Sequence, residues 1–575
     1  MVEWRIVHSF LNWNKLFNIV HKFKKKNMKK NLQNLLLITF LTLGVTSNSQ
    51  NRYLDEVFSS IKITDSVMYA QNVSIEPMLI GLGPALMPIY CDIYEPVGDT
   101  LTERPVIILA HTGSFLPPVA NGQATGSIKD SSIVEQCKRW AKKGYVAVAM
   151  TNRLGWNPTS TDQNVRTSTL LQASYRAIQD AKAMVRYMRM TEDNGNPYGI
   201  DPDKIVLGGQ GTGAYISLGY ATLDDESKLY LPKFIDQSNP QIPIPYVVPV
   251  YMGNFDGTDM TYAPLLDSNG IPMVDTSSGV VIPLVDSSSP LNIPNNPTYS
   301  NDINLAFNMG GALADISWLE AGDIPIVSFH CEKDEYAPID TGDVIVPTTG
   351  DFVVEVMGSR TVQHYSNQYG NNDVFINAGF TDAITNQANI NNGWYEGLYV
   401  FKTPPPSTTP NAYGELEEEQ GSPWDWWDNT TYGLLAQAVN GIAGVTSPGY
   451  FEANAILDNP DMSAAKGKTY IDTIQSYLNP RIYIALNLGN ALSEYNVIDY
   501  STSVYPNPSN NVISINNSNF IIDNINLYSV SGKLVKSQKV NSMQTNLNVT
   551  NLESGIYFLN IYSNNSIIKR KIVVK

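Results

Sequence analysis

The sequence predicts a large α/β domain, built on a doubly wound, mostly parallel sheet with helices on both faces, and a small all-β domain resembling a sandwich. Three observations favour this fold class. Short apolar runs alternate with amphipathic stretches over residues 50–495, the composition turns to Asn, Ser, Val and Ile in short alternating segments after Asp499, and 575 residues that are 43% apolar suffice for a large core. We therefore expect a large domain at 50–495, a linker at 496–503 and a small domain at 504–575.

The strands expected in the large domain are mostly short and continuously apolar. Runs of this kind are typical of parallel strands that helices cover on both faces. The expected strands lie at 90–94, 106–110, 145–150, 204–207 and 324–329, and the expected helices at 133–143, 171–188 and 463–478. Two polar, irregular segments, near 231–300 and 378–428, interrupt this alternation, and we interpret both as insertions over the edge of the sheet.

The first 49 residues have the layout of a secretory signal peptide. A basic run at 22–30 precedes an apolar run at 35–45 and the small polar residues 46–49. Met28, directly before Lys29, is an alternative start of the chain. Because the apolar run is shorter than the roughly 20 residues that span a bilayer, we expect export rather than an integral membrane protein.

The overall charge and the cysteines exclude several functions. A net charge of −16 argues against nucleic acid, since affinity for phosphate backbones depends on Lys and Arg. The three cysteines, Cys91, Cys137 and Cys331, leave at least one thiol unpaired, and their pairing stays open. No Cys or His spacing predicts a metal site, so we expect neither a metal nor a cofactor.

The segment most informative about chemistry follows the expected strand at 204–207. Gly209-Gln-Gly-Thr-Gly213 lies where the G-x-S-x-G elbow would present a nucleophile between a strand and a helix, and Gly211 occupies the serine position. Thr212 lies beside the apex and Ser217 a turn or more down the helix, so neither is a good substitute. The turn is therefore expected without its nucleophile.

Several further motifs accompany this turn in the order that a known family shows. They are Asp92–Pro96, Leu109–Phe115, Tyr175–Ala183, Tyr198–Lys204 and Ile324–Asp334. Over most of residues 80–370 the chain resembles secreted carboxylesterase-like and feruloyl-esterase-like α/β-hydrolases. The resemblance implies the α/β-hydrolase fold and, where the serine is present, hydrolysis of carboxylic esters.

The resemblance also implies roles for individual residues. His111, Thr112 and Gly113 belong to the oxyanion-hole loop, in which Thr112 and Ser114 depart from H-G-G-G-F, and Thr212 follows the nucleophile position. Gly209 and Gly213 flank the elbow.

The acid and the base of the triad differ in how well the sequence supports them. Asp334 takes the position of the triad acid, although a carboxylate after a strand also caps turns. The one histidine left for the base is His364, which lies in an expected helix and which we interpret as a packing or surface residue rather than a base. The later loop Gln420–Trp424 contains no histidine.

Two other clusters have both structural and binding interpretations. Trp424, Trp426 and Trp427, beside Asp425 and Asp428, could stack on sugars, but we favour a role as core anchors. The acidic stretch 254–259 lacks a full calcium-loop pattern, and we expect an ordinary turn.

The C-terminal segment resembles the sorting domain of cargo of the type IX secretion system. The matching motifs are Val504–Pro508, Leu527–Gly532, Gly555–Leu559 and Lys569–Lys575. The resemblance implies a partnership with that machinery and passage, through the periplasm, to the surface or surroundings of a Gram-negative bacterium.

Together these observations favour a secreted hydrolase-like protein that has lost its nucleophile and binds an ester, glycan or peptide. Two alternatives stay open. The chain could be an ester hydrolase with atypical machinery, or a structural or adhesion protein of the cell surface.

Overall fold

The computed structural model describes most of the chain. The described residues are 51–238, 243–268, 272–277, 282–346, 349–404, 420–428, 455–456, 459–490, 502–517, 521–529, 533–563 and 566–575. The expected signal peptide with Met28 and most of the expected linker at 496–503 lie outside these residues.

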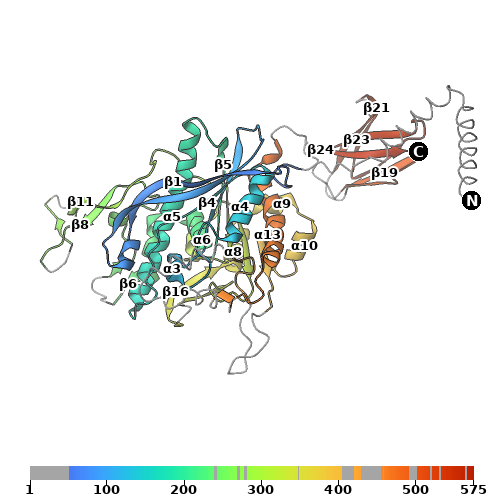
Figure 1. Ribbon diagram of the computed structural model, residues 1–575. Helices are drawn as coiled ribbons and strands as arrows, with labels where there is room; N and C mark the ends of the chain where they lie inside the picture. Colours follow the sequence, from blue (N-terminus) through green and yellow to red (C-terminus); the bar gives the residue numbers. More distant parts are fainter. Residues whose placement is uncertain are drawn as a thin grey trace, which may run out of the picture.

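The centre of the large domain is an eight-stranded sheet in the order β1-β2-β4-β3-β5-β12-β14-β17 (Figure 1). β1 and β2 pair antiparallel with each other, β2 pairs antiparallel with β4, and all later neighbours are parallel. The strands are β1 (Ile61–Ser74), β2 (Ala85–Pro96), β3 (Arg104–Ala110), β4 (Val146–Met150), β5 (Ile200–Gln210), β12 (Leu305–Met309), β14 (Ile326–Cys331) and β17 (Leu398–Phe401). The doubly wound, mostly parallel sheet predicted from the sequence is thus confirmed.

Helices cover both faces of this sheet, as the pattern of side chains within a strand shows. Along β3, Val106 and Ile108 pack in one apolar core with side chains of α5 and α6, whereas Ile107 and Leu109 pack in a second core with side chains of α4 and α13. Alternate residues of a strand point to opposite faces, so the two cores lie on opposite sides of the sheet. A strand buried on both faces needs the continuous apolar run that the sequence shows.

The helices begin and end at recognisable signals. Asp162 caps α5 by accepting from the Asn164 amide, and Ser463 caps α13 by accepting from the Lys466 amide. The helices are α3 (Pro118–Asn121), α4 (Ser131–Lys143), α5 (Gln163–Asp193), α6 (Thr212–Thr222), α7 (Pro249–Met252), α8 (Ser359–Gln368), α9 (Asp373–Ala378), α10 (Ala383–Ala388) and α13 (Ala464–Ala485).

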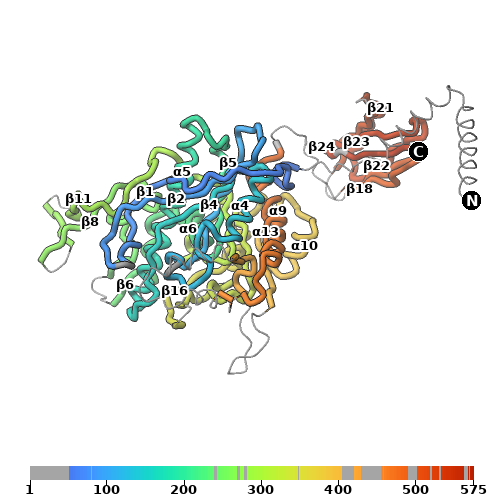
Figure 2. The backbone as a smooth tube through the Cα atoms, viewed as in Figure 1, coloured from blue at the N-terminus to red at the C-terminus, as the bar shows by residue number. Residues whose placement is uncertain are grey.

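The two expected insertions have different places in the fold. The described residues within 231–300 include short two-stranded pairs outside the central sheet, of which β8 (Thr261–Pro264) and β11 (Val285–Asn292) make a narrow arm, green at the left of Figure 2. The remaining short strands there are β6 (Ile235–Asp236), β7 (Ile244–Pro245), β9 (Val274–Asp275) and β10 (Ile282–Pro283). Residues 378–428, by contrast, contribute β17 to the sheet, so interpreting that whole segment as an insertion is wrong. Leu398–Phe401 is only four residues long, which is why its apolar run is hard to recognise among loops.

Residues between β12 and α8 form a separate three-stranded sheet. β16 (Phe352–Gly358) pairs with β15 (Thr341–Ile345) on one side and with β13 (Ala312–Leu313) on the other. Val354 and Val356 of β16 join the core that contains α5 and α6. This sheet therefore adds an apolar wall on that face of the domain.

The C-terminal segment folds into two antiparallel sheets with a core of its own. One has the order β18-β19-β22 and the other β21-β20-β23-β24. Ile513, Ile515 and Leu547 from the first sheet and Ile525, Leu527, Leu559 and Ile561 from the second are buried together. The strands are β18 (Thr502–Tyr505), β19 (Val512–Asn517), β20 (Ile522–Ser529), β21 (Leu534–Ser542), β22 (Gln544–Asn548), β23 (Gly555–Ser563) and β24 (Ser566–Val574). The predicted all-β, sandwich-like architecture is confirmed.

Two features bear on the sequence predictions, and a third, a buried ion pair, is used in the Discussion. All three cysteines are buried, and none of them forms a disulfide. Among the described residues no helix combines the length and the apolar character that a membrane span requires. Arg153 and Asp180 form a buried ion pair between the loop after β4 and α5, with an Nη2–Oδ1 distance of 2.9 Å and side chains that are each 2% exposed.

Candidate functional site

The expected elbow is present between β5 and α6. Gly211 has φ 55° and ψ −117°, and its amide donates to Met309 O at 2.9 Å. A glycine adopts this backbone conformation freely, whereas other residues are strained there. The flanking glycines are required by packing, because a Cβ on Gly209 would lie 2.0 Å from the Gly213 carbonyl carbon and a Cβ on Gly213 would lie 2.2 Å from Ala110 O.

The space that a side chain on Gly211 would need is already filled. A Cβ at this position would lie 2.2 Å from the Thr112 Oγ1 and 2.9 Å from the Thr112 Cβ. Both distances are far below van der Waals contact. The Thr112 side chain therefore fills the space that a side chain at position 211 would need.

The two amides expected from the sequence to form an oxyanion hole are those of Gly113 and Thr212. In the described part of the chain, the amides of Gly113 and Thr212 donate to no other group. His111 is buried beside them, and its Nδ1 donates to the Thr112 carbonyl. Burial lowers the pKa of His111, so the ring is neutral and serves as a donor that fixes this loop.

Asp334 lies in the turn after β14, where the acid of a triad is expected. Its Oδ1 accepts from the Tyr336 and Ala337 amides at 2.8 and 3.0 Å. The side chain is 4% exposed, and burial raises its pKa to about 7. The turn-capping interpretation of Asp334 accounts for these contacts.

His330 lies close to Asp334, but both of its ring nitrogens form hydrogen bonds with other groups. Its Nε2, 3.8 Å from Asp334 Oδ2, donates to Ala337 O, and its Nδ1 accepts from Ser359 Oγ. Burial lowers the pKa of His330 to about 4, so it carries no charge near neutral pH. It cannot act as a base toward the elbow in this arrangement.

A glycine backbone occupies the space beside Asp334 where a base would be needed. A Cβ on Gly421 would lie 2.9 Å from Asp334 Oδ1 and 3.1 Å from Oδ2. His364, the candidate from sequence, lies in α8, where its Nδ1 contacts the Tyr395 hydroxyl at 3.1 Å and its ring packs on Tyr365. His364 does not line the cavity described below, and no histidine is among the described residues that do.

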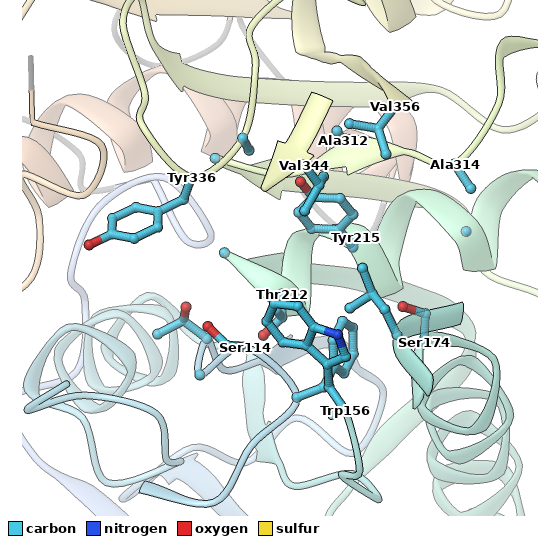
Figure 3. Close-up of a pocket in the computed structure, with 18 of the residues that line it drawn as sticks. Ser114, Trp156, Ser174, Thr212, Tyr215, Ala312, Ala314, Tyr336, Val344 and Val356 are labelled. Carbon is cyan, nitrogen blue, oxygen red and sulfur yellow. The ribbon is translucent and has the colours of Figure 1, made fainter. Parts of the chain in front are cut away.

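A cavity of about 210 Å³ opens above the elbow. In Figure 3, Ser114, Thr212 and Trp156 are drawn on one side of the pocket, and Ala312, Ala314, Val344 and Val356 on another. Other apolar lining residues come from α5 and the segment after α6: Leu170, Leu171, Ile178, Leu223, Leu229 and Phe234. The cavity is therefore mostly apolar, with a small polar region at the elbow.

Two buried carboxyl groups, Asp425 and Asp130, have contacts that the sequence did not predict. Asp425, which lines the cavity, accepts through Oδ1 from Ser132 Oγ at 2.7 Å and from Gln210 Nε2 at 2.5 Å. Burial raises the pKa of Asp425 to about 6 and that of Asp130 to about 7. The sequence signal was an aspartate between tryptophans, which had suggested sugar binding instead.

The remaining candidates have structural roles in the described residues. Trp424, Trp426 and Trp427 are buried, as the core-anchor interpretation requires. Ser217 is fully buried and donates to backbone carbonyls, so it cannot replace the nucleophile. In the stretch 254–259, Asn254 Oδ1 accepts from the Thr258 amide and Asp256 pairs with Lys182, which makes this stretch a turn. No group of His, Cys, Asp and Glu suited to a metal ion occurs among the described residues.

The sheet order, the elbow and the oxyanion amides define an esterase-like α/β-hydrolase scaffold. Residues 91–269 match the model of the BD-FAE family, and residues 503–575 match that of the secretion system C-terminal sorting domain. Both resemblances inferred from sequence motifs are thereby confirmed. The sorting-domain match indicates secretion or display at the cell surface, with handling by the type IX machinery.

Solved esterases are among the structures similar to this chain. Thermogutta terrifontis esterase 2 phosphorylated by paraoxon is 15% identical, over 49% of this chain and 74% of that one, with a TM-score of 0.25. Esterase B from Lactobacillus rhamnosis, inhibited by a C4-C4 SN3 tributyrin phosphonate, is 13% identical, over 54% and 77% of the two chains, with a TM-score of 0.25. Among curated proteins, none matches the sequence.

Proposed function

We propose that this chain is a secreted, non-catalytic α/β-hydrolase that binds a small, largely apolar ligand in the cavity above its elbow. The observation on which the proposal depends is the contact between Gly211 and Thr112. Ester hydrolysis by this scaffold requires an activated nucleophile at the elbow. Here the position holds a hydrogen atom, and a threonine side chain fills the space above it.

The other triad positions support the same conclusion. Asp334 faces the Gly421 backbone rather than an imidazole, and His364 contacts Tyr365 and Tyr395 instead. The hydroxyl of Thr112 is thus without a histidine that could accept its proton. Loss of both nucleophile and base leaves at most the residual acceleration of about 10³ over water seen when triads are removed.

The cavity wall and the backbone amides beside it are suited to binding a ligand. The cavity keeps an apolar wall, and the free amides of Gly113 and Thr212 can donate to a ligand oxygen. Burying apolar ligand surface contributes about 25 cal/mol per Å² before the costs of association. Binding therefore needs none of the groups that have been replaced.

The test combines turnover, covalent trapping and binding on the same purified protein. We expect no hydrolysis of p-nitrophenyl acetate or butyrate above background, no adduct with a fluorophosphonate probe, and saturable binding of a neutral apolar fluorophore such as Nile red. Ala314→Trp, which fills the cavity, is expected to abolish fluorophore binding. The matched control Ala378→Trp, at an exposed position on α9, is expected to bind normally.

The outcomes separate the proposal from its alternatives. A phosphonyl adduct mapped by mass spectrometry to Thr112 or any other cavity residue would show an atypical hydrolase. Failure of Nile red to bind, in a protein that is folded by circular dichroism, would favour a structural or adhesion role.

A further inference from the structure

Among the described residues, the lining of the cavity contains acidic side chains but no basic ones. Asp334 and Asp425 are its only lining residues with formally charged side chains, and no Lys, Arg or His lines it among the described residues. Both carboxyl groups are more than nine-tenths buried, with side-chain exposure of 4% for Asp334 and residue exposure of 7% for Asp425. Burying a carboxylate without a cation is costly, so each is destabilised while the cavity is empty.

In each aspartate one oxygen is fully engaged and the other is not. The Oδ1 atom of Asp334 accepts from two backbone amides, and the Oδ1 atom of Asp425 accepts from Ser132 and Gln210. In the described part of the chain, neither Oδ2 accepts a hydrogen bond, and the neutral His330, 3.8 Å from Asp334 Oδ2, gives its proton to Ala337 O. Each of these two buried carboxyl groups, which line the cavity, therefore has an acceptor atom that no described group uses.

Aromatic rings surround the same space. Phe115, Trp156, Tyr215, Tyr336 and Trp427 all line the cavity, and Figure 3 shows three of them, Trp156, Tyr215 and Tyr336, around its polar side. The face of an aromatic ring attracts a cation, and the interaction strengthens when water is excluded. The Trp427 indole N–H is a further buried polar group on the cavity lining, and it has no hydrogen-bond acceptor among the described residues.

We propose that the ligand of this cavity is an apolar amine, with a cationic nitrogen facing Asp334 and Asp425 and a hydrocarbon or aromatic body against the apolar wall. This inference rests on the proposed function. An ammonium group would supply the missing countercharge and donate to the two free Oδ2 atoms. An anionic ligand of the same shape would meet two carboxylates in a medium of low dielectric constant and bind most weakly.

The pH dependence follows from the groups that face each carboxyl. The groups near Asp334 are the neutral His330 on β14 and the Tyr215 phenol on α6, and Asp425 is bonded by Ser132 and Gln210 and lies close enough to Asp130 to raise the pKa of that carboxyl. No cation is among them, and burial raises the pKa of Asp334 to about 7 and that of Asp425 to about 6. Amine binding is therefore expected to strengthen as pH rises from about 5 to about 8.5, where the carboxyls ionise and the amine remains protonated.

Three probes of equal shape test the proposal by isothermal titration calorimetry on the full secreted chain. They are 3-phenylpropylamine, 3-phenylpropanol and 3-phenylpropanoate, which differ in the charge of one terminal group. At about pH 8.5 we expect the amine to bind at least about tenfold more tightly than the alcohol, a difference of about 1.4 kcal/mol, and the carboxylate to bind most weakly. At about pH 5 the advantage of the amine should shrink severalfold.

Isosteric variants assign this preference to the two carboxyls. Asp334→Asn and Asp425→Asn keep an Oδ1 acceptor for the existing donors, so the fold is expected to persist. Each should lower the affinity for the amine and leave that for the alcohol unchanged. Asp340→Asn, at an exposed side chain outside the cavity lining, is the matched control and should change neither.

Each result distinguishes this inference from the proposed function. Equal affinity for amine and alcohol, or tighter binding of the carboxylate, would overturn the amine proposal and leave a non-catalytic binding pocket intact. Failure of all three probes and of Nile red to bind would overturn both. A preference for the amine that survives in both Asn variants would also refute the assignment, because the charge would then come from elsewhere.

Discussion

Restoring a serine at position 211 should fail unless Thr112 is removed at the same time. A serine there would hold the backbone at φ 55°, which costs about 1–3 kcal/mol for a residue other than glycine. Its Cβ would also lie 2.2 Å from Thr112 Oγ1, and overpacking of this kind typically costs about 1–3 kcal/mol. Gly211→Ser alone is therefore expected to lower the free energy of unfolding by about 2–6 kcal/mol.

A double-mutant cycle separates the two costs. Thr112→Gly removes the clashing atoms, so the pair with Gly211→Ser should recover the overpacking part, about 1–3 kcal/mol, and leave the backbone part. Thr112→Ser keeps the Oγ and should rescue little. The assay is urea denaturation followed by tryptophan fluorescence on all four proteins, with reversibility checked for each. Additive effects within about 0.5 kcal/mol would refute the conclusion that Thr112 fills the nucleophile's place.

The same variants should not gain esterase activity. In Thr112→Gly/Gly211→Ser the hydroxyl has room, yet no histidine lines the cavity to activate it. Adding Gly421→His would bring a Cβ to 2.9 Å from Asp334 Oδ1, so the loop must first move away. Rapid ester turnover by the double variant would show that a base exists which the described residues do not contain.

Three further predictions follow from other parts of the molecule. Because burial raises the pKa of Asp334 and Asp425 to about 7 and about 6, the folded protein holds more protons than the unfolded chain above about pH 4. Its Tm should therefore fall between about pH 4 and pH 7, and Asp334→Asn should flatten this slope. Arg153→Ala leaves Asp180 buried without its partner and should lower the free energy of unfolding by about 3–5 kcal/mol, whereas an unchanged urea midpoint would contradict this. Deleting residues 503–575 should retain the protein in the cell, and immunoblots that show undiminished secretion would refute a sorting role.

Most of the fold could be predicted from local sequence patterns. A buried parallel strand such as Val106–Ala110 needs a continuous apolar run whatever surrounds it. β17 was missed because four residues, Leu398–Phe401, make too short a run to distinguish a strand from a loop. The elbow was located because its glycines are dictated by local backbone contacts. These features depend on residues near one another in the chain.

The site itself depends on contacts between distant segments, and these are not visible in a linear pattern. Thr112 was recognised as a departure from the loop motif, but its contact with position 211 joins residues about a hundred positions apart. Asp425 likewise meets Ser132 and Gln210 only in the folded chain. The sequence could name the positions that depart from the family motifs, whereas the contacts between them required the structure.

Gly211 and Gly421 have different consequences for the site. At Gly211 the absence of a side chain lets the backbone adopt φ 55° without the strain that a serine would bring, so the elbow forms at no conformational cost. At Gly421 a Cβ would lie 2.9 Å from Asp334 Oδ1, so a glycine is what lets the backbone approach that carboxyl this closely. Burial raises the pKa of Asp334 to about 7, and the His330 imidazole 3.8 Å away bonds Ala337 O instead. We therefore expect the site to favour a ligand able to supply a positive charge, in line with the proposal above.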